Sequence, residues 1–293
     1  MNIADRRAII ALPIILLFAT LVAWAGSQGG YTVSGIPVFA LCLALAFVLQ
    51  WIAFIPAFIL QTEKFYDLMG SITYLSITVI AIFLSPVADA RTWLLLAIVS
   101  VWAIRLGTFL FRRVRAAGED RRFRDIKPSL ARFLLTWTIQ GLWISLTLAA
   151  ALAAITTMTR RDLGFIGLLG FLIWSLGFGI EVIADQQKSK FRANPQNSGK
   201  FINTGLWSWS RHPNYFGEIV LWFGVAIIAI PVLSGWQWLT LISPIFVVLL
   251  LTRVSGVPML EKRADEKWGG QAGYEDYKAR TSLLFLRPPS AEK

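Results

Sequence analysis

Long apolar segments alternate with short polar ones along the chain, and this pattern predicts a bundle of membrane-spanning helices. Each apolar segment approaches or exceeds the ~20 residues that a helix needs to cross a bilayer. The fold class expected is therefore all-α, a polytopic membrane bundle of eight transmembrane helices. Merging the weak first segment or the close last pair would give seven. The segments are Ala8–Ala25, Ile36–Leu60, Phe65–Leu84, Thr92–Phe111, Phe133–Ile155, Leu163–Ala184, Tyr215–Leu233 and Trp238–Thr252.

The composition favours one integral membrane domain over residues 1–293 rather than soluble domains. Hydrophobic residues make up 56% of the chain and charged residues 15%, whereas soluble domains average about 25% charged residues. The single cysteine, Cys42, and the single histidine, His212, exclude a disulfide framework and nearly all Cys/His metal sites. No metal is expected. No P-loop is present, and no G-x-G-x-x-G motif follows a strand.

The distribution of basic residues predicts the orientation in the membrane. The net charge is +11, and most Lys and Arg residues lie in the segments 61–65, 112–132 and 186–213 and in the C-terminal tail. These segments fall on one side when the spans alternate, and the positive-inside rule makes that side cytoplasmic. Arg160–Arg161 is an exception on the other side. The expected partner of this charge is anionic lipid, not nucleic acid.

This pattern predicts a multi-pass protein of a bacterial inner membrane, or of the endoplasmic reticulum in a eukaryote. The first apolar segment lacks a small-residue cleavage site and is expected to be an anchor. The sequence leaves the oligomeric state open, and a monomer is compatible with it.

A polar stretch between two apolar helices is the strongest candidate for a ligand site. Glu181 and Asp185 end one span, and Asn214 and Glu218 begin the next, with His212 just before them. A charged side chain at the centre of a membrane helix costs about 2.5–3.5 kcal/mol on insertion scales. Such residues usually have a partner or a bound ligand, so a site is expected here.

Further polar residues lie at or inside the predicted membrane boundary. Arg105 is in the middle of the fourth span, and Glu63, Tyr66 and Asp67 begin the third. Alternation of the spans brings all of them toward the predicted cytoplasmic side. Arg105 is too deep to reach the interface fully by extending its side chain, so an ion pair or a ligand oxygen is expected beside it.

Basic clusters on the same side have two interpretations. Arg112–Arg124 is typical of a topology anchor, but Arg and Lys are also the donors that a phosphorylated cofactor needs. Lys188, Lys190, Arg192 and Lys200 add to this charge. The glycines of Gly177–Phe178–Gly179 lie within a span and predict helix packing or local flexibility rather than a nucleotide motif.

Three stretches resemble one family. W-A-I-R-L-G-T-F (102–109), G-L-W-S-W-S-R-H-P-N-Y-F-G-E (205–218) and Y-E-D-Y-K-A-R-T-S (274–282) are similar to the C-terminal domain of steroid 5α-reductases and related sterol C14-reductases. The resemblance covers roughly residues 100–285. The segment R-H-P-N-Y-F-G is also similar to the R-H-P-x-Y-x-G of isoprenylcysteine-type membrane methyltransferases.

The resemblance to steroid 5α-reductases implies NADPH-dependent reduction of the Δ4 carbon–carbon double bond of a 3-oxo-steroid. Residues 1–91 would contribute the substrate pocket and residues 92–285 the cofactor part. Asp67, with Tyr66 and Glu63, would polarise the substrate ketone. Trp102 would contact the substrate, at a position where steroid reductases carry Tyr. The cofactor residues implied are Arg105, Arg113, Asp185, Arg192, His212, Asn214, Glu218, Glu261 and Tyr277.

The sequence leaves two other classes of function open. An S-adenosylmethionine-dependent membrane methyltransferase acting on a lipid or prenylated substrate would share the R-H-P-N-Y turn, although its cofactor carries no phosphate for the basic loops. A transporter would line a path through the middle of the membrane with polar residues, whereas here they gather on one side.

Glu181 lies at a position where the steroid 5α-reductases carry Asn. The sequence does not identify the physiological substrate.

Overall fold

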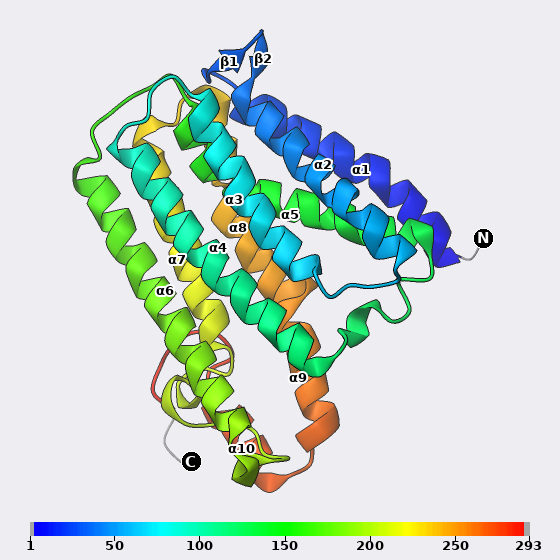
Figure 1. Cartoon of the computed structure of the whole chain (residues 1–293). Coiled ribbons are helices and arrows are strands. Elements are labelled where there is room, and N and C mark those ends of the chain that lie inside the picture. The colour runs from blue at the N-terminus through cyan, green and yellow to red at the C-terminus, as the bar shows by residue number, and fades with distance from the viewer. Residues whose placement is uncertain (1–2, 290–293) are drawn as a thin grey trace. The chain divides into compact units, whose positions relative to one another are not determined.

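The computed structural model describes residues 3–289 and is predominantly helical in that range (Figure 1). Eight helical segments of the described chain are long and apolar enough to cross a membrane. This confirms the prediction of an all-α multi-pass membrane protein. The helices are α1 (Ile3–Gly26), α2 (Val38–Ile59), α3 (Tyr66–Leu84), α4 (Ala90–Ala117), α5 (Leu130–Thr156), α6 (Gly164–Ala193), α7 (Pro213–Ala229), α8 (Ile242–Leu249), α9 (Gly256–Trp268) and α10 (Ala272–Arg280).

The last candidate span is longer and less regular than the sequence pattern predicts. It covers Gly235–Trp268 and begins with a 3-10 helix, Gly235–Leu241, before α8. A π-helical turn, Leu250–Val254, then leads into α9. The predicted tail after residue 252 is therefore helical, and its first helix continues the last span.

The chain divides into two compact units, which are described separately. Unit 1 comprises the described residues up to Gly167 together with Ile228–Ser243, and unit 2 comprises Leu168–Ile227 and the described residues from Pro244 onward. The predicted division into residues 1–91 and 92–285 concerns roles in function and stays a prediction.

In unit 1, helix α5 is the central element. Its second half, with the alanine-rich run 149–154, is almost completely buried, and α1, α2, α3 and α4 all contact the helix. Small side chains let helix backbones approach closely, which suits a buried membrane helix. Between α1 and α2, a hairpin joins β1 (Thr32–Val33) and β2 (Ile36–Pro37) through Ser34 and Gly35, both at positive φ.

At one end of unit 1 the polar segment 61–65 is held by the loop before α5. The Glu63 carboxylate is 3% exposed; it accepts the backbone N–H of Asp120 at 2.8 Å and pairs with Lys127 Nζ at 2.5 Å. Asp5 near the N-terminus accepts the hydroxyl of Ser129 at 2.6 Å. The N-terminus and the segments 61–65 and 118–129 therefore lie together, as alternation of the spans predicts.

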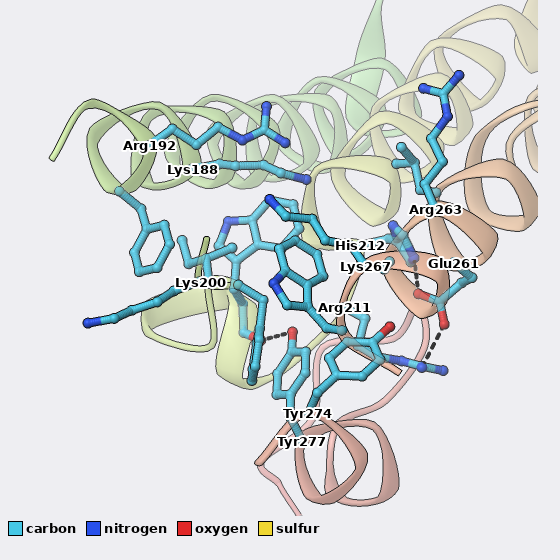
Figure 2. Close-up of a pocket in the computed structure, with 17 residues that line it drawn as sticks. Lys188, Arg192, Lys200, Arg211, His212, Glu261, Arg263, Lys267, Tyr274 and Tyr277 are labelled. Carbon is cyan, nitrogen blue, oxygen red and sulfur yellow. Dashed lines mark hydrogen bonds and ion pairs between the residues drawn. The ribbon is translucent and has the colours of Figure 1, made fainter. Parts of the chain in front are cut away.

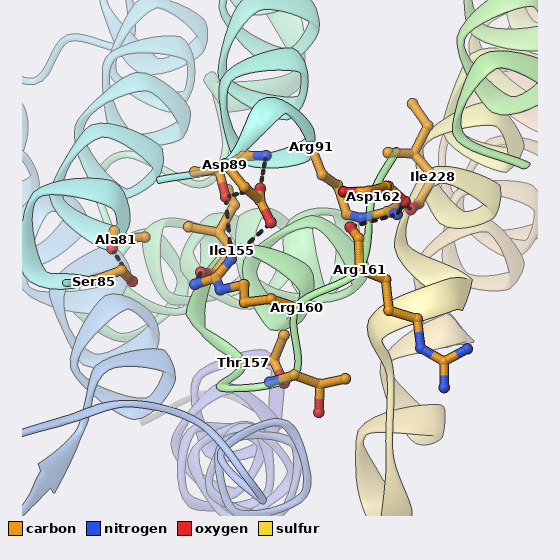
Figure 3. A network of polar contacts seen from close by, with 12 residues as sticks. Ala81, Ser85, Asp89, Arg91, Ile155, Thr157, Arg160, Arg161, Asp162 and Ile228 are labelled. Carbon is orange, nitrogen blue, oxygen red and sulfur yellow. Dashed lines mark hydrogen bonds and ion pairs between the residues drawn. The ribbon is translucent and has the colours of Figure 1, made fainter. Parts of the chain in front are cut away.

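The opposite end of unit 1 is held by two arginines, the buried Arg91 and the half-buried Arg160 (Figure 3). Arg91 is 1% exposed and donates to the carbonyls of Ile228 and Asp162, the latter at 2.8 Å. Arg160 contacts Asp89 at 3.5 Å and donates to the Ile155 carbonyl at 3.2 Å. Arg160 is one of the two arginines that break the positive-inside pattern. Its charge is compensated by these contacts within the fold.

In unit 2, α6 and α7 pack backbone against backbone. A Cβ atom on Gly177 would lie 2.4 Å from the backbone nitrogen of Leu221, and one on Gly217 would lie 2.6 Å from that of Glu181. A Cβ on Gly179 would meet no atom within 4 Å. The sequence predicted helix packing or local flexibility at Gly177 and Gly179. Packing is confirmed for Gly177, whereas Gly179 lies on an open face.

Candidate functional site

Unit 2 contains a cavity of about 320 Å³ whose wall is strongly basic and aromatic (Figure 2). Its lining comes from the end of α6, the segment 200–212, α9 and α10. One acid, Glu261, also lines it. The six basic residues are Lys188, Arg192, Lys200, Arg211, Arg263 and Lys267, and the six aromatic ones are Phe191, Phe201, Trp207, Trp268, Tyr274 and Tyr277.

Trp207 anchors the polar loop to α6. Its ring is 3% exposed, and its Nε1–H donates to the Ala184 carbonyl at 3.0 Å. Gly205 reaches a positive φ of 62°, and the side chain of Gln187 accepts the backbone N–H of Leu206 at 3.0 Å. The Lys188 ammonium lies 4.1 Å from the centre of the Trp207 ring, within cation–π range. One wall of the cavity thus combines an aromatic face with a positive charge.

Helices α9 and α10 close the other wall on the same loop. Trp268 Nε1–H donates to the Gly199 carbonyl at 2.5 Å, and the Tyr277 hydroxyl donates to the Trp207 carbonyl at 2.6 Å. The Phe201 ring packs edge-on against Tyr274, with centroids 5.3 Å apart. Burial raises the pKa of the Tyr277 hydroxyl above its ordinary value, so this group stays a hydrogen-bond donor at neutral pH.

His212 lies at the junction of these walls and pairs with Glu261. Its Nε2 atom lies 2.8 Å from Glu261 Oε1, and Arg211 pairs with the other carboxylate oxygen at 2.6 Å (Figure 2). Burial lowers the pKa of His212 below its ordinary value, although the bond to Glu261 opposes the shift. The neutral ring donates through Nε2–H because a carboxylate only accepts. Nδ1 is then a buried acceptor, and it has no hydrogen-bond partner among the described residues.

A second polar pair joins α6 to α7. Asn214 Nδ2–H donates to Asp185 Oδ1 at 3.2 Å, and Asp185 is 7% exposed. Glu218 follows one turn later on α7 and is half-buried. The sequence prediction that these polar residues gather between the two helices is therefore matched by the Asp185–Asn214 contact.

A family model of proteins of unknown function, DUF1295, matches residues 53–281, which include α3 to α10 and the whole basic cavity. The chain belongs to the DUF1295 family. The family description carries no activity, so it adds none to the geometry of the site.

Curated relatives of this DUF1295 protein match it only in part. A probable O-methyltransferase, ustE, of Ustilaginoidea virens is 36% identical over 58 residues, 20% of each chain. An uncharacterized protein, C594.04c, of Schizosaccharomyces pombe is 24% identical over 190 residues, which cover 54% of this chain and 55% of the relative. The DUF1295 chain thus spans about half or less of the length of these relatives. No solved structure is significantly similar to it.

Of the cofactor residues implied by the steroid 5α-reductase resemblance, four line the cavity: Arg192, His212, Glu261 and Tyr277. Asp185, Asn214 and Glu218 belong to the same unit but are not part of its lining.

The two remaining arginines of that set, Arg105 and Arg113, belong to unit 1. The Arg105 guanidinium lies 5.3 Å from the centre of the Phe109 ring, and Arg113 is exposed on α4. Their predicted roles toward a cofactor stay predictions.

The residues implied at the substrate end also belong to unit 1. Tyr66 is buried in an aromatic cluster, and its hydroxyl donates to the Thr136 carbonyl at 3.0 Å. Glu63 is bound as described above. Asp67 is half-buried in the first turn of α3, where the charges of Arg122 and Arg113 act on it.

Trp102 is 2% exposed and packs edge-on against Tyr74, with ring centroids 5.1 Å apart. The predicted contact of Trp102 with a substrate stays a prediction.

On the α9 side of the cavity, sequence reasoning named only Glu261. Leu260, Ala264, Lys267 and Trp268 line it together with Glu261 and Arg263. Their spacing of three, four, seven and eight residues is that of one helical face. The sequence contained this signal inside a charged tail, where the charges suggested plain solvation.

Proposed function

We propose that this protein is a membrane enzyme that reduces a carbon–carbon double bond conjugated to a ketone, with NADPH as hydride donor. The substrate proposed is the Δ4 double bond of a 3-oxo-steroid or a similar apolar enone. The observation that carries this proposal is the basic and aromatic cavity of unit 2. The resemblance of residues 100–285 to steroid 5α-reductases supplies the reaction class.

The charge of the cavity fits a phosphorylated cofactor. Six basic side chains and one carboxylate line it, and Arg211 already pairs with that carboxylate. The lining therefore carries a large excess of positive over negative charge. Arg and Lys bind phosphate oxygens through charge-assisted hydrogen bonds, which are about twice as strong as neutral ones. A dinucleotide with three phosphates would compensate this charge.

The other groups of the cavity fit the rest of a dinucleotide. Trp207, Trp268 and Phe201 offer flat apolar faces against which an adenine ring can stack. The Nδ1 atom of His212 is a buried acceptor that suits a hydroxyl or amino donor of a ligand. NADPH, when bound, supplies the hydride, and the protein positions it and excludes water.

At the substrate end, Asp67 is the residue that we propose acts on the ketone oxygen. Tyr66 already gives its hydroxyl to Thr136, and Glu63 is engaged by Lys127 and the Asp120 backbone. A protonated Asp67 carboxyl would donate a hydrogen bond to the ketone and stabilise negative charge that develops on its oxygen. One such preorganised donor is worth about 2.7–4 kcal/mol of transition-state stabilisation.

The location of the enzyme is part of the proposal. The basic segments favour an orientation in which the cavity of unit 2 opens to the cytoplasm, where NADPH is available. An apolar substrate would enter from the lipid phase.

A second candidate is methyl transfer from S-adenosylmethionine, favoured by the 58-residue similarity to a probable O-methyltransferase. The cofactor of that reaction carries a sulfonium cation and no phosphate. The excess positive charge of the cavity lining would repel it rather than bind it. The charge of the lining therefore favours NADPH.

Thermal unfolding of the detergent-solubilised protein with each cofactor distinguishes the two candidates. A ligand that binds the folded state stabilises it and raises the melting temperature. At a ligand concentration of about 100 times Kd, the free energy of unfolding rises by about 2.7 kcal/mol. NADPH is expected to stabilise the protein and S-adenosylmethionine to leave it unchanged. Oxidation of NADPH on addition of a 3-oxo-Δ4-steroid then tests the reaction. Stabilisation by S-adenosylmethionine alone would reverse the assignment.

A further inference from the structure

The C-terminal segment of unit 2 is bonded along its length to the residues just before His212. Ser282 pairs with Ser210 in a parallel bridge, and the backbone N–H of Arg211 donates to the Ser282 carbonyl at 2.8 Å. Farther along, the N–H of Arg287 donates to the Trp209 carbonyl at 3.3 Å. The segment 282–287 thus fixes the backbone at 209–211.

Ser210 connects this segment to His212 through one hydroxyl group. The residue is completely buried. Its Oγ donates to the Leu284 carbonyl at 2.8 Å and accepts the backbone N–H of His212 at 3.1 Å. Both hydrogen-bonding roles of the hydroxyl are therefore used, one toward each side.

His212 is then held at two points. Ser210 fixes its backbone nitrogen, and Glu261 on α9 fixes its ring through Nε2. The bond to the carboxylate selects the tautomer that carries hydrogen on Nε2, because the partner of one ring nitrogen decides the state of the other. This leaves Nδ1 as a buried acceptor on a residue that lines the cavity.

We propose that Ser210 is a positioning residue for ligand binding, which holds His212 in register with Glu261 and depends on the C-terminal segment to do so. Its effect on cofactor affinity rests on the proposed function, whereas its effect on the His212 ring does not. Without the hydroxyl, the Leu284 carbonyl and the His212 N–H each lose this buried partner, and the segment 209–212 is free to shift. The ring then separates from Glu261, and the selection of one tautomer is lost.

The single histidine of the chain makes this proposal directly measurable. Protein purified without a histidine tag and labelled with heavy nitrogen in histidine gives ring signals from His212 alone. The wild-type ring is expected to carry its hydrogen on Nε2 only. Ser210→Ala should show both tautomers and bind NADPH about tenfold more weakly, a loss of about 1.4 kcal/mol.

Two further variants make the result specific. Ser208→Ala is the matched control, because the Ser208 hydroxyl bonds only within its own turn, to the Gly205 carbonyl; it should behave as wild type. A chain ending after Ser282 keeps Ser210 but removes its acceptor, Leu284, and should reproduce Ser210→Ala. Melting temperatures establish that each variant is folded.

The outcomes separate this inference from the proposed function. A folded Ser210→Ala with the wild-type ring signal and unchanged NADPH affinity would overturn it, and so would failure of both that variant and the shortened chain to fold. If NADPH leaves the wild-type ring signal unmoved, the proposed cofactor is wrong, while the tautomer comparison still tests the role of Ser210.

Discussion

The imidazole of His212 lies 2.8 Å from the Glu261 carboxylate, although 49 residues separate them in the chain. One belongs to the segment before α7 and the other to α9, so this contact joins two walls of the basic cavity. It also decides which ring nitrogen carries the hydrogen and leaves Nδ1 as a buried acceptor. The pairing therefore connects the closure of the cavity with its hydrogen-bonding chemistry.

Acid should destabilise the protein through His212. Burial lowers the pKa of this residue below its ordinary value of 6.5, so the unfolded chain binds a proton more readily than the folded one. The stability contributed by the neutral ring is complete above pH 6.5 and is lost as pH falls through the lowered pKa. Melting temperatures measured from pH 8 to pH 5 should fall more steeply for wild type than for His212→Gln. Parallel curves would contradict this prediction.

The basic wall of α6 should contribute strongly to NADPH affinity. Replacing Arg192 or Lys188 by Gln removes a charge from the cavity lining, and a charged hydrogen bond is worth about 1.5–3 kcal/mol. NADPH binding should weaken by about ten- to a hundredfold, as isothermal calorimetry would measure. Lys190→Gln is the control, since Lys190 is exposed on the same helix and is not part of the lining. An equal loss in all three variants would mean a diffuse charge effect.

The close approach of α6 and α7 should make Gly177 sensitive to a single methyl group. Gly177→Ala would place Cβ against the backbone of Leu221, and overpacking of this kind costs about 1–3 kcal/mol. Gly179→Ala would meet open space and should be nearly neutral. Thermal unfolding of the two variants in the same detergent tests the difference. Equal melting temperatures would show that the two helices can separate without cost.

Asp67 and Glu63 should respond differently to substitution. Asp67→Ala removes the proposed donor and is expected to reduce turnover by a hundredfold or more, on the order of the loss of one preorganised donor, and to leave NADPH affinity unchanged. Glu63→Gln breaks a buried pair with Lys127 and should instead lower stability, by about 3–5 kcal/mol. Turnover, NADPH titration and melting temperature together separate these effects. Loss of NADPH binding in Asp67→Ala would refute its role at the substrate end.

The membrane fold could be predicted correctly because each span is a run of consecutive apolar residues, whose length is visible in the sequence itself. The basic side of the cavity could also be predicted, since Lys188 and Arg192 lie at the end of an apolar helix and Lys200 follows it. The contact between Asp185 and Asn214 was also predictable, because the two residues lie at the end of one apolar span and the start of the next. These features depend on residue type and local spacing.

The rest of the site depends on contacts between distant segments. The Arg211 N–H bonds to the Ser282 carbonyl, and the Ser210 hydroxyl bonds to the Leu284 carbonyl. Every residue carries a main-chain carbonyl, so residue type does not show which carbonyl is the acceptor. The engagement of the Tyr66 hydroxyl by the Thr136 carbonyl is of the same kind. The predicted roles of Asp67, Trp102, Arg105 and Arg113 stay predictions.

Two arginines at the end of unit 1 opposite the segment 61–65 bear on how charges are counted when membrane orientation is predicted from sequence. Arg91 and Arg160 bind carbonyl groups at helix ends and an aspartate, so their charge is compensated inside the fold. These two residues therefore need not count against the predicted orientation. Neutralising Arg160 would remove its contacts with Asp89 and the Ile155 carbonyl. We expect this to weaken helix packing at this end of unit 1 and to leave the orientation in the membrane unaltered.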